Sequence, residues 1–191
     1  MVAWYRMDEA ANDSCSGGTD VCDSSTNEYH GTVTGTTIVA GKYGNARSFP
    51  DATTDYVNIP SVFGLGTTNV VIEAWVNLDS TSESGAFVKV GTTNGYGIGV
   101  GSSTFDNAGN DLILLYEGVR WIDTNTTIGT GWHHVAMVID ASGVPSAYRD
   151  GTLITSYSGT NAIAPTTSTN IGGYTNVIDR YVDADIDDVR I

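Results

Sequence analysis

Hydrophobic and polar residues alternate with a period of two along most of the chain, and no segment keeps a helical period. Clusters of Gly, Asn, Asp and Ser, such as GTTNG and ASGVP, separate the alternating runs. The pattern predicts strands over residues 2–7, 30–34, 45–49, 55–59, 69–78, 85–90, 96–101, 111–116, 132–140, 145–149, 152–157, 168–173 and 182–191. So many short strands, with no internal repeat or long linker, predict one all-β domain over residues 1–191. We expect a two-sheet antiparallel jelly-roll sandwich.

The segment NVVIEAWVNL, residues 69–78, indicates how one strand faces the core. Its even-numbered positions are all apolar: Val70, Ile72, Ala74, Val76 and Leu78. Because alternate side chains of a strand point to opposite faces, this set is predicted to point into the sandwich. Glu73 and Trp75 then lie on the opposite face. The sequence leaves open whether a loop covers them or a ligand reaches them.

Charge and hydropathy exclude two classes of partner. The net charge is −14 and the only lysines are Lys42 and Lys89, so the surface repels phosphate backbones and nucleic acid is not expected as a partner. The acidity fits a solvated face, calcium ligation or adaptation to salt. No apolar run approaches the roughly 18–20 residues that span a bilayer, so membrane insertion is not expected.

Composition favours a secreted or cell-surface microbial protein, and the chain ends favour a module of a larger protein. Thr, Ser, Gly, Asn and Asp are abundant, as is usual in such proteins. The strand-like VAWYRM at the start and the DIDDVRI that ends the chain in mid-strand predict a module of a larger protein.

Cys15 and Cys22 are the only cysteines and flank the short segment CSGGTDVC. An even pair in an exported protein predicts a disulfide. A two-thiolate metal site needs further His or Cys ligands at metal-site spacing, and none stands nearby.

Eight motifs occur in an order that resembles the laminin-G-like jelly rolls of the concanavalin A-like lectin/glucanase superfamily. They are AWYRMDEAANDSC, DSSTNEYHGTVTG, GKYGNARSFPDATTDYVNIP, VIEAWVNLDS, GWHHVAMVID, AYRDGTLITS, TNIGGY and DIDDVRI. The resemblance spans nearly the whole chain. It departs at the inserted cysteine loop of residues 15–22, and at Met7, Thr26 and Ala184, where the family usually has other residues.

The resemblance implies framework histidines and no catalytic centre. In the family, Trp-His-His-Val begins a central strand, and the adjacent His133 and His134 would face opposite sides of the sheet. Relatives that cleave β-glucans carry Glu-x-Asp-x-x-Glu on one strand, whereas here Trp75 follows Glu73 at the second acidic position. No Gly-x-Ser-x-Gly elbow, phosphate loop or His-Glu-x-x-His occurs. We therefore expect a chain that is not an enzyme.

Calcium is the expected cofactor, in a structural role. The turn DSSTNEYHG offers oxygen ligands from Asp23, Asn27 and the His30 carbonyl. The resemblance places this turn near the closing strand, where Asp187 would complete the shell and tie the chain ends together. The alternative is a turn held by side-chain hydrogen bonds without an ion.

A sugar site needs an aromatic platform and polar groups for hydroxyls. The segment YEGVRWIDTN, residues 116–125, has that composition. Other polar and aromatic residues can share its rim. The predicted sugar-binding residues are Asn94, Tyr96, Tyr116, Arg120, Trp121, Asp123, Asn125, Tyr174 and Arg180. The alternative is that Trp121 packs over a sheet edge and the remainder is solvated loop.

These patterns lead to one leading expectation and two rivals. We expect a non-catalytic, lectin-like carbohydrate-binding module, stabilised by calcium, with a glycan or polysaccharide as its partner. The first rival is an adhesion or spacer module that binds protein or a neighbouring domain, because the fold alone does not determine function. The second is a glycan-cleaving enzyme with an unfamiliar pair of acids.

Overall fold

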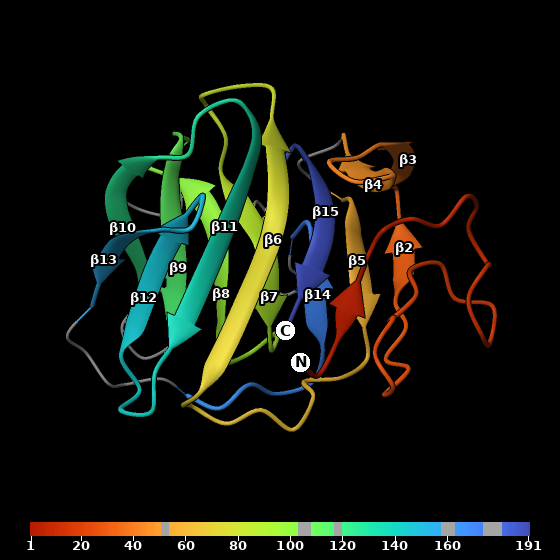
Figure 1. The fold of residues 1–191 in the computed structure, drawn as a ribbon, viewed down its shortest axis with the longest axis horizontal. Coiled ribbons are helices and arrows are strands. Elements are labelled where there is room, and N and C mark those ends of the chain that lie inside the picture. The colour runs from red at the N-terminus through yellow and green to blue at the C-terminus, as the bar shows by residue number, and fades with distance from the viewer. Residues whose placement is uncertain (51–53, 103–107, 117–119, 158–162, 174–180) are drawn as a thin grey trace.

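The computed structural model describes residues 1–50, 54–102, 108–116, 120–157, 163–173 and 181–191, with the side chains of Arg120 and Trp121 excluded. Two antiparallel sheets pack face to face in a jelly-roll sandwich (Figure 1). None of the described residues is helical, so no helix there is long and apolar enough to cross a membrane.

The first sheet has eight strands and the order β13-β12-β11-β6-β15-β4-β3, with β1 also paired to β15. Its strands are β1 (Trp4–Tyr5), β3 (Thr37–Ala40), β4 (Asn45–Phe49), β6 (Val70–Leu78), β11 (Gly131–Ile139), β12 (Pro145–Arg149), β13 (Thr152–Ser156) and β15 (Ala184–Arg190). The face of this sheet that is turned away from the core is called the outer face below.

The second sheet has seven strands in the order β10-β9-β8-β7-β14-β5-β2. Its strands are β2 (Thr32–Thr34), β5 (Tyr56–Ile59), β7 (Gly85–Val90), β8 (Tyr96–Gly101), β9 (Asp111–Tyr116), β10 (Arg120–Thr127) and β14 (Thr169–Ile171). It lies behind the first sheet in Figure 1.

The core lies between the sheets and is built as the alternation of β6 predicts. Val70, Ile72, Ala74, Val76 and Leu78 are all buried in the main hydrophobic cluster. Glu73 and Trp75 lie on the other side of the strand and are partly exposed. The prediction for this strand is confirmed. Burying its purely apolar face gains more free energy than burying the face that carries Glu73 and Trp75 would.

The thirteen strands predicted from alternation are all present, with bounds that differ by a few residues at some ends. Two strands were not predicted, β3 and β10. Both lie at a sheet edge. An edge strand has a neighbour on one side only and carries more polar residues, so its alternation is weak. The segment of residues 116–125, predicted to bind sugar, is therefore partly a strand.

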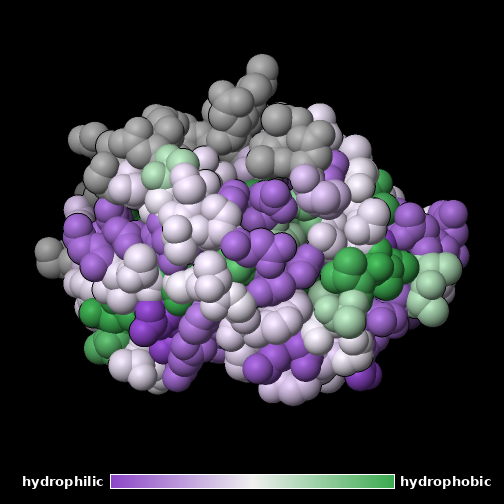
Figure 2. Space-filling model, turned by 90° about the horizontal axis from the view of Figure 1, so that it is seen from above, coloured by the Kyte–Doolittle hydropathy of each residue, from purple (hydrophilic) through white to green (hydrophobic). Residues whose placement is uncertain are grey.

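The two chain ends meet beside the first sheet (Figure 1), and the Val2 backbone N–H donates to the Ile191 carbonyl over 2.6 Å. Seen from above, the molecule is mostly hydrophilic or of intermediate hydropathy, and its hydrophobic residues form small separate patches (Figure 2). On that side, the described residues do not form one broad apolar surface.

Candidate functional site

A bulge in β15 creates a hollow on the outer face. β15 pairs with β4 at Ala184–Ile186 and then with β1 at Val189–Arg190. Between these partners Asp188 has a φ of 48°, and the register against β6 shifts. Ile186 and Val189 both point into the core as a result. Asp tolerates this left-handed conformation better than most residues do, which suits it to a bulge.

The bulge brings Asp187 and Arg190 to the same face, because Asp187 pairs with Trp75 and Arg190 pairs with Glu73 of β6. A strict alternation would have put residues 187 and 190 on opposite faces. Together with neighbouring side chains they line a hollow of about 420 Å³, which we call the outer-face groove. Its lining residues are Trp4, Arg6, Asp8, Tyr43, Trp75, Asp187, Asp188 and Arg190.

Aromatic rings supply part of the groove surface. Tyr43, in the β3–β4 turn, is 57% exposed, and its ring meets Trp75 edge to face with centroids 5.9 Å apart. The Lys42 ammonium lies 4.4 Å from the Trp75 ring centroid. His134 packs against Trp75 from the other neighbouring strand, β11, with centroids 5.4 Å apart. Trp75 is therefore held in place, and Tyr43 is the more open platform.

Trp4 is fixed by the charged residues around it. The guanidinium carbons of Arg6 and Arg190 lie 5.5 and 5.3 Å from its ring centroid. Its indole N–H donates to Asp188 Oδ1 over 2.5 Å. These cation–π contacts and the hydrogen bond tie β1 to the bulge of β15.

The charges of the groove are largely paired with one another. Arg190 donates to Asp188 over 2.7 Å and to Glu73 over 3.2 Å. Arg6 forms an ion pair with Asp8 over 2.8 Å. Both arginines of the lining have carboxylate partners, and three carboxylates line the groove against these two arginines, so the described lining carries no excess of positive charge for an anionic ligand.

Asp187 is the exception among these carboxylates. Its side chain is fully buried at the base of the groove, and its Oδ2 accepts a hydrogen bond from the Tyr43 backbone N–H over 2.9 Å. Within the described residues its Oδ1 has no hydrogen-bond partner. Burial, aided by the nearby Asp188 and Asp8 carboxylates, outweighs the backbone hydrogen bonds that lower the pKa of Asp187 and raises it to about 6. Part of the Asp187 population is therefore protonated near neutral pH.

The predicted calcium turn is closed by hydrogen bonds to Asp23. Its Oδ1 accepts from the backbone N–H groups of Trp4 and Ser25, and its Oδ2 accepts from the Ser25 hydroxyl and the Tyr29 N–H, all within 3.0 Å. Burial raises the pKa of Asp23, but these hydrogen bonds outweigh it and hold the pKa below its ordinary value. A carboxylate has about four lone-pair sites. A calcium ion at Asp23 would therefore have to replace bonds already made.

Asn27 and His30 make hydrogen bonds through side-chain nitrogens, and Asp187 lies elsewhere. Asn27 Nδ2 donates to the Val2 carbonyl over 2.9 Å, and His30 Nδ1 accepts from the Asp23 backbone N–H over 3.0 Å. Asp187 lines the outer-face groove with other partners. The oxygen atoms predicted as ligands, those of Asn27 and the His30 carbonyl, take no part in these two hydrogen bonds. Calcium therefore stays a prediction, and no step below depends on it.

The predicted disulfide is confirmed. Cys15 and Cys22 are bonded, with Cα atoms 5.4 Å apart. Glu9 lies beside them and accepts a hydrogen bond from the Cys22 backbone N–H over 2.8 Å. Among the residues that the structure describes, Glu9, Cys15 and Cys22 form the one close group of three acid, histidine or cysteine ligands. Since both sulfurs are in the disulfide, this group offers no thiolate to a metal.

Two of the predicted sugar-binding residues are core residues instead. Tyr96 and Tyr116 are fully buried in the main cluster. The Tyr96 hydroxyl donates to the Gly66 carbonyl over 2.9 Å, and the Tyr116 hydroxyl donates to the Gly143 carbonyl. The prediction was wrong for both, because each hydroxyl finds a backbone partner that allows the ring to be buried. The sequence carried the signal: Tyr96 shares a strand face with Ile98 and Val100.

The remaining predicted sugar residues do not gather with the outer-face groove. Asn94, Asp123 and Asn125 belong to the second sheet or its turns, and Asp123 Oδ1 accepts from the Asn125 backbone N–H over 2.8 Å. The backbones of Arg120 and Trp121 lie in β10, and their side chains are not described. Tyr174 and Arg180 lie outside the described residues.

His133 and His134 contact different acids, which agrees with the framework role expected from the sequence. His133 Nδ1 lies 2.8 Å from Asp150 Oδ2. His134 Nε2 lies 3.7 Å from Glu73 Oε2 on the outer face. The two rings do not share one site. His134 nevertheless borders the groove through Trp75, and the sequence did not reveal this contact.

Comparison with known proteins gives the family. A sequence profile of the concanavalin A-like lectin/glucanases superfamily matches residues 51–191. No curated protein sequence matches. Domain 4 of the extracellular arabinanase AbnA from Geobacillus stearothermophilus, solved in complex with arabinotriose, superposes with a TM-score of 0.67 at 20% identity, covering 99% of this chain and 90% of that one.

Two clostridial toxin domains have the same fold. The binding domain of Paraclostridial Mosquitocidal Protein 1 superposes with a TM-score of 0.67 at 14% identity, covering 97% of this chain and 47% of that one. The binding domain of botulinum neurotoxin DC, in complex with rat synaptotagmin II, gives 0.61 at 15% identity, covering 94% and 46%. This chain thus spans about half the length of the toxin domains. Identities this low show the fold alone. With the sandwich topology and a profile match over most of its length, the chain belongs to the concanavalin A-like lectin/glucanases superfamily.

Proposed function

We propose that this chain is a non-catalytic carbohydrate-binding module of a secreted or cell-surface microbial protein, and that the outer-face groove binds the glycan. The observation that carries the proposal is the groove itself, where an exposed aromatic ring stands beside paired arginines and carboxylates. The disulfide fits an oxidising, extracytoplasmic location.

The chemistry of the groove suits a sugar. A pyranose or furanose ring has apolar C–H groups that pack on an aromatic face and hydroxyls that donate and accept hydrogen bonds. Tyr43, 57% exposed, supplies an accessible ring. Asp8, Asp188 and Arg190 supply acceptors and donors at the rim. Because the arginines are already paired with carboxylates, a neutral glycan fits better than a uronic acid or a sulfated sugar.

Binding is favoured over hydrolysis by the state of the acids. A retaining glycosidase needs one carboxylate free to attack and a second free to give and take a proton. In the groove, Asp188 is held by Arg190 and Trp4, and Asp8 is held by Arg6. Asp187 is buried at the base. A retaining enzyme would need to release one of these ion pairs before reaction.

The test is a binding titration of a panel of neutral oligosaccharides that includes arabinotriose. Tyr43→Ala and Trp75→Ala should each weaken binding about tenfold or more, because an aromatic platform contributes both buried area and ring contacts. Neither ring belongs to the core, so circular dichroism and melting should show that both variants fold. Trp121→Ala, on the opposite sheet, serves as the matched control. Loss of binding in Trp121→Ala with full affinity in Trp75→Ala would move the site to β10.

A protein partner is the second candidate, because one domain of this fold is solved in complex with rat synaptotagmin II. If the folded domain binds no member of the glycan panel, with or without calcium, a protein partner is favoured. Release of reducing sugar from any member of the panel would instead favour the hydrolase.

A further inference from the structure

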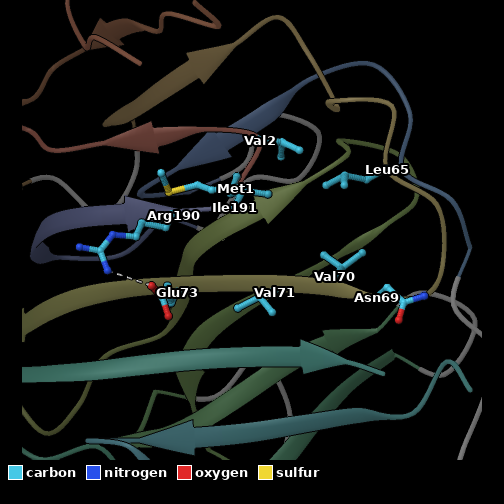
Figure 3. Close-up of a pocket in the computed structure, with 9 residues that line it drawn as sticks. All are labelled: Met1, Val2, Leu65, Asn69, Val70, Val71, Glu73, Arg190 and Ile191. Carbon is cyan, nitrogen blue, oxygen red and sulfur yellow. Dashed lines mark hydrogen bonds and ion pairs between the residues drawn. The ribbon is translucent and has the colours of Figure 1, made fainter. Parts of the chain in front are cut away.

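A second hollow lies beside the outer-face groove and differs from it in chemistry. It measures about 320 Å³ and is walled mainly by apolar side chains, which we call the apolar hollow. Met1, Val2, Leu65 and Val71 form much of its surface, and Glu73 and Arg190 close one end (Figure 3). β6 provides the floor, the chain ends provide one wall, and the loop that precedes β6 provides the other.

The two hollows are joined at Arg190, which lines both. Its Nη1 donates to Glu73 Oε1 over 3.2 Å, and its Nη2 donates to Asp188 over 2.7 Å (the former is dashed in Figure 3). Val71, Glu73 and Trp75 follow one another on the same face of β6. A ligand on Trp75 therefore reaches Val71 by crossing a single ion pair.

The apolar hollow is open to solvent. Val71 is 44% exposed and Met1 is 72% exposed. Among the described residues, six large hydrophobic side chains are exposed. Met1 and Val71 line the apolar hollow and Tyr43 lines the groove, so three of these six residues border the two adjoining hollows. Single exposed apolar residues need no explanation, but a group of them beside a candidate site does.

We propose that the apolar hollow is a second subsite, which receives an apolar group, acyl or aryl, carried by the glycan bound in the groove. This inference rests on the proposed function. Sugar hydroxyls placed against Val2, Leu65 and Val71 would lose their hydrogen bonds to water and gain none, whereas an alkyl or aryl group gains by leaving water. Glu73 and Arg190 then separate the polar part of the ligand from the apolar part.

The experiment compares arabinotriose with octyl arabinotrioside, used below its micelle concentration, by isothermal titration calorimetry. Each buried CH₂ strengthens binding about fourfold, so the octyl form should bind at least tenfold more tightly to the wild-type chain. Val71→Asp should remove this gain and leave arabinotriose affinity unchanged. Leu153→Asp is the matched control, because Leu153 is 52% exposed on β13 of the same sheet and lies outside both hollows. It should keep the full gain.

The outcomes separate this inference from the proposed function. Equal affinities for the two probes, or an octyl gain that survives in Val71→Asp, overturns the second subsite and leaves the glycan site standing. Binding of octyl arabinotrioside alone, sensitive to Val71→Asp and insensitive to Trp75→Ala, overturns the proposed function and retains the hollow as an apolar site. If neither probe binds, the second subsite fails, and the proposed function fails with it when the rest of the oligosaccharide panel also shows no binding.

Discussion

Replacing Asp187 by asparagine tests the electrostatics of the groove directly. The Asp187 side chain is fully buried with one oxygen unpartnered among the described residues, and burial raises its pKa from 3.8 to about 6. The folded protein therefore holds the Asp187 proton more tightly than the unfolded chain does. Stability from this group is fully present below pH 4 and is lost as the pH rises through about 6.

The size of the effect follows from the pKa difference. One pKa unit corresponds to about 1.4 kcal/mol, so a shift from 3.8 to about 6 gives roughly 3 kcal/mol between low and neutral pH. Water in the adjoining groove screens the charge, which makes this an upper value. Between pH 5 and pH 7 the folded chain should lose about 1 kcal/mol of unfolding free energy through Asp187.

Urea unfolding at pH 5 and pH 7, in EDTA, measures this loss. Asp187→Asn keeps the shape and an oxygen that can accept from the Tyr43 N–H, so it should abolish that part of the pH dependence and be the more stable protein at pH 7. Asp185→Asn removes a carboxylate from the same strand and should keep the wild-type slope. An Asp187→Asn variant that loses as much stability as the wild type between the two pH values would refute the reasoning.

Two further predictions concern the N-terminal region. Reduction, or the double change Cys15→Ser and Cys22→Ser, should lower the unfolding free energy by roughly 2–3 kcal/mol by loop-closure entropy, as a melting curve with and without reductant will show; an unchanged curve would mean that the loop of residues 15–22 carries none of the stability. If calcium is bound, EDTA should lower the melting temperature by several degrees and Asp23→Ala should erase that sensitivity. If metal analysis finds no calcium and EDTA leaves the melting curve unchanged, the calcium prediction is wrong and the turn is held by hydrogen bonds alone.

The strands with two neighbours were predictable from their residues. β7, β8, β9 and β12 have the bounds that alternation predicts, because each buries an apolar face whose residues recur every second position. β3 and β10 escaped detection because an edge strand needs less apolar surface, and β10 also shifts register between Asp123 and Thr127. The disulfide was predictable because only one pairing of two cysteines exists.

The candidate site was only half visible in the sequence. The alternation of β6 places Trp75 and Glu73 on the face turned away from the core. That face can be buried only if another part of the chain covers it. What could not be read was which distant residues meet Trp75. Tyr43 comes from a turn, Trp4 from the first strand and Asp187 from the last, and pairing between strands far apart in sequence leaves no local pattern.

The sequence by itself determined the all-β sandwich, its core faces and the bridge between Cys15 and Cys22, because these follow from residue periodicity and from a single possible pairing. The tertiary structure alone decided the groove. The left-handed Asp188 breaks the alternation of β15. Asp187 and Arg190 therefore lie on the same face, whereas a strict period of two would place them on opposite faces. A bulge of one residue costs little within a strand, yet it reverses the face of every residue after it, and this is why the site had to be seen in three dimensions.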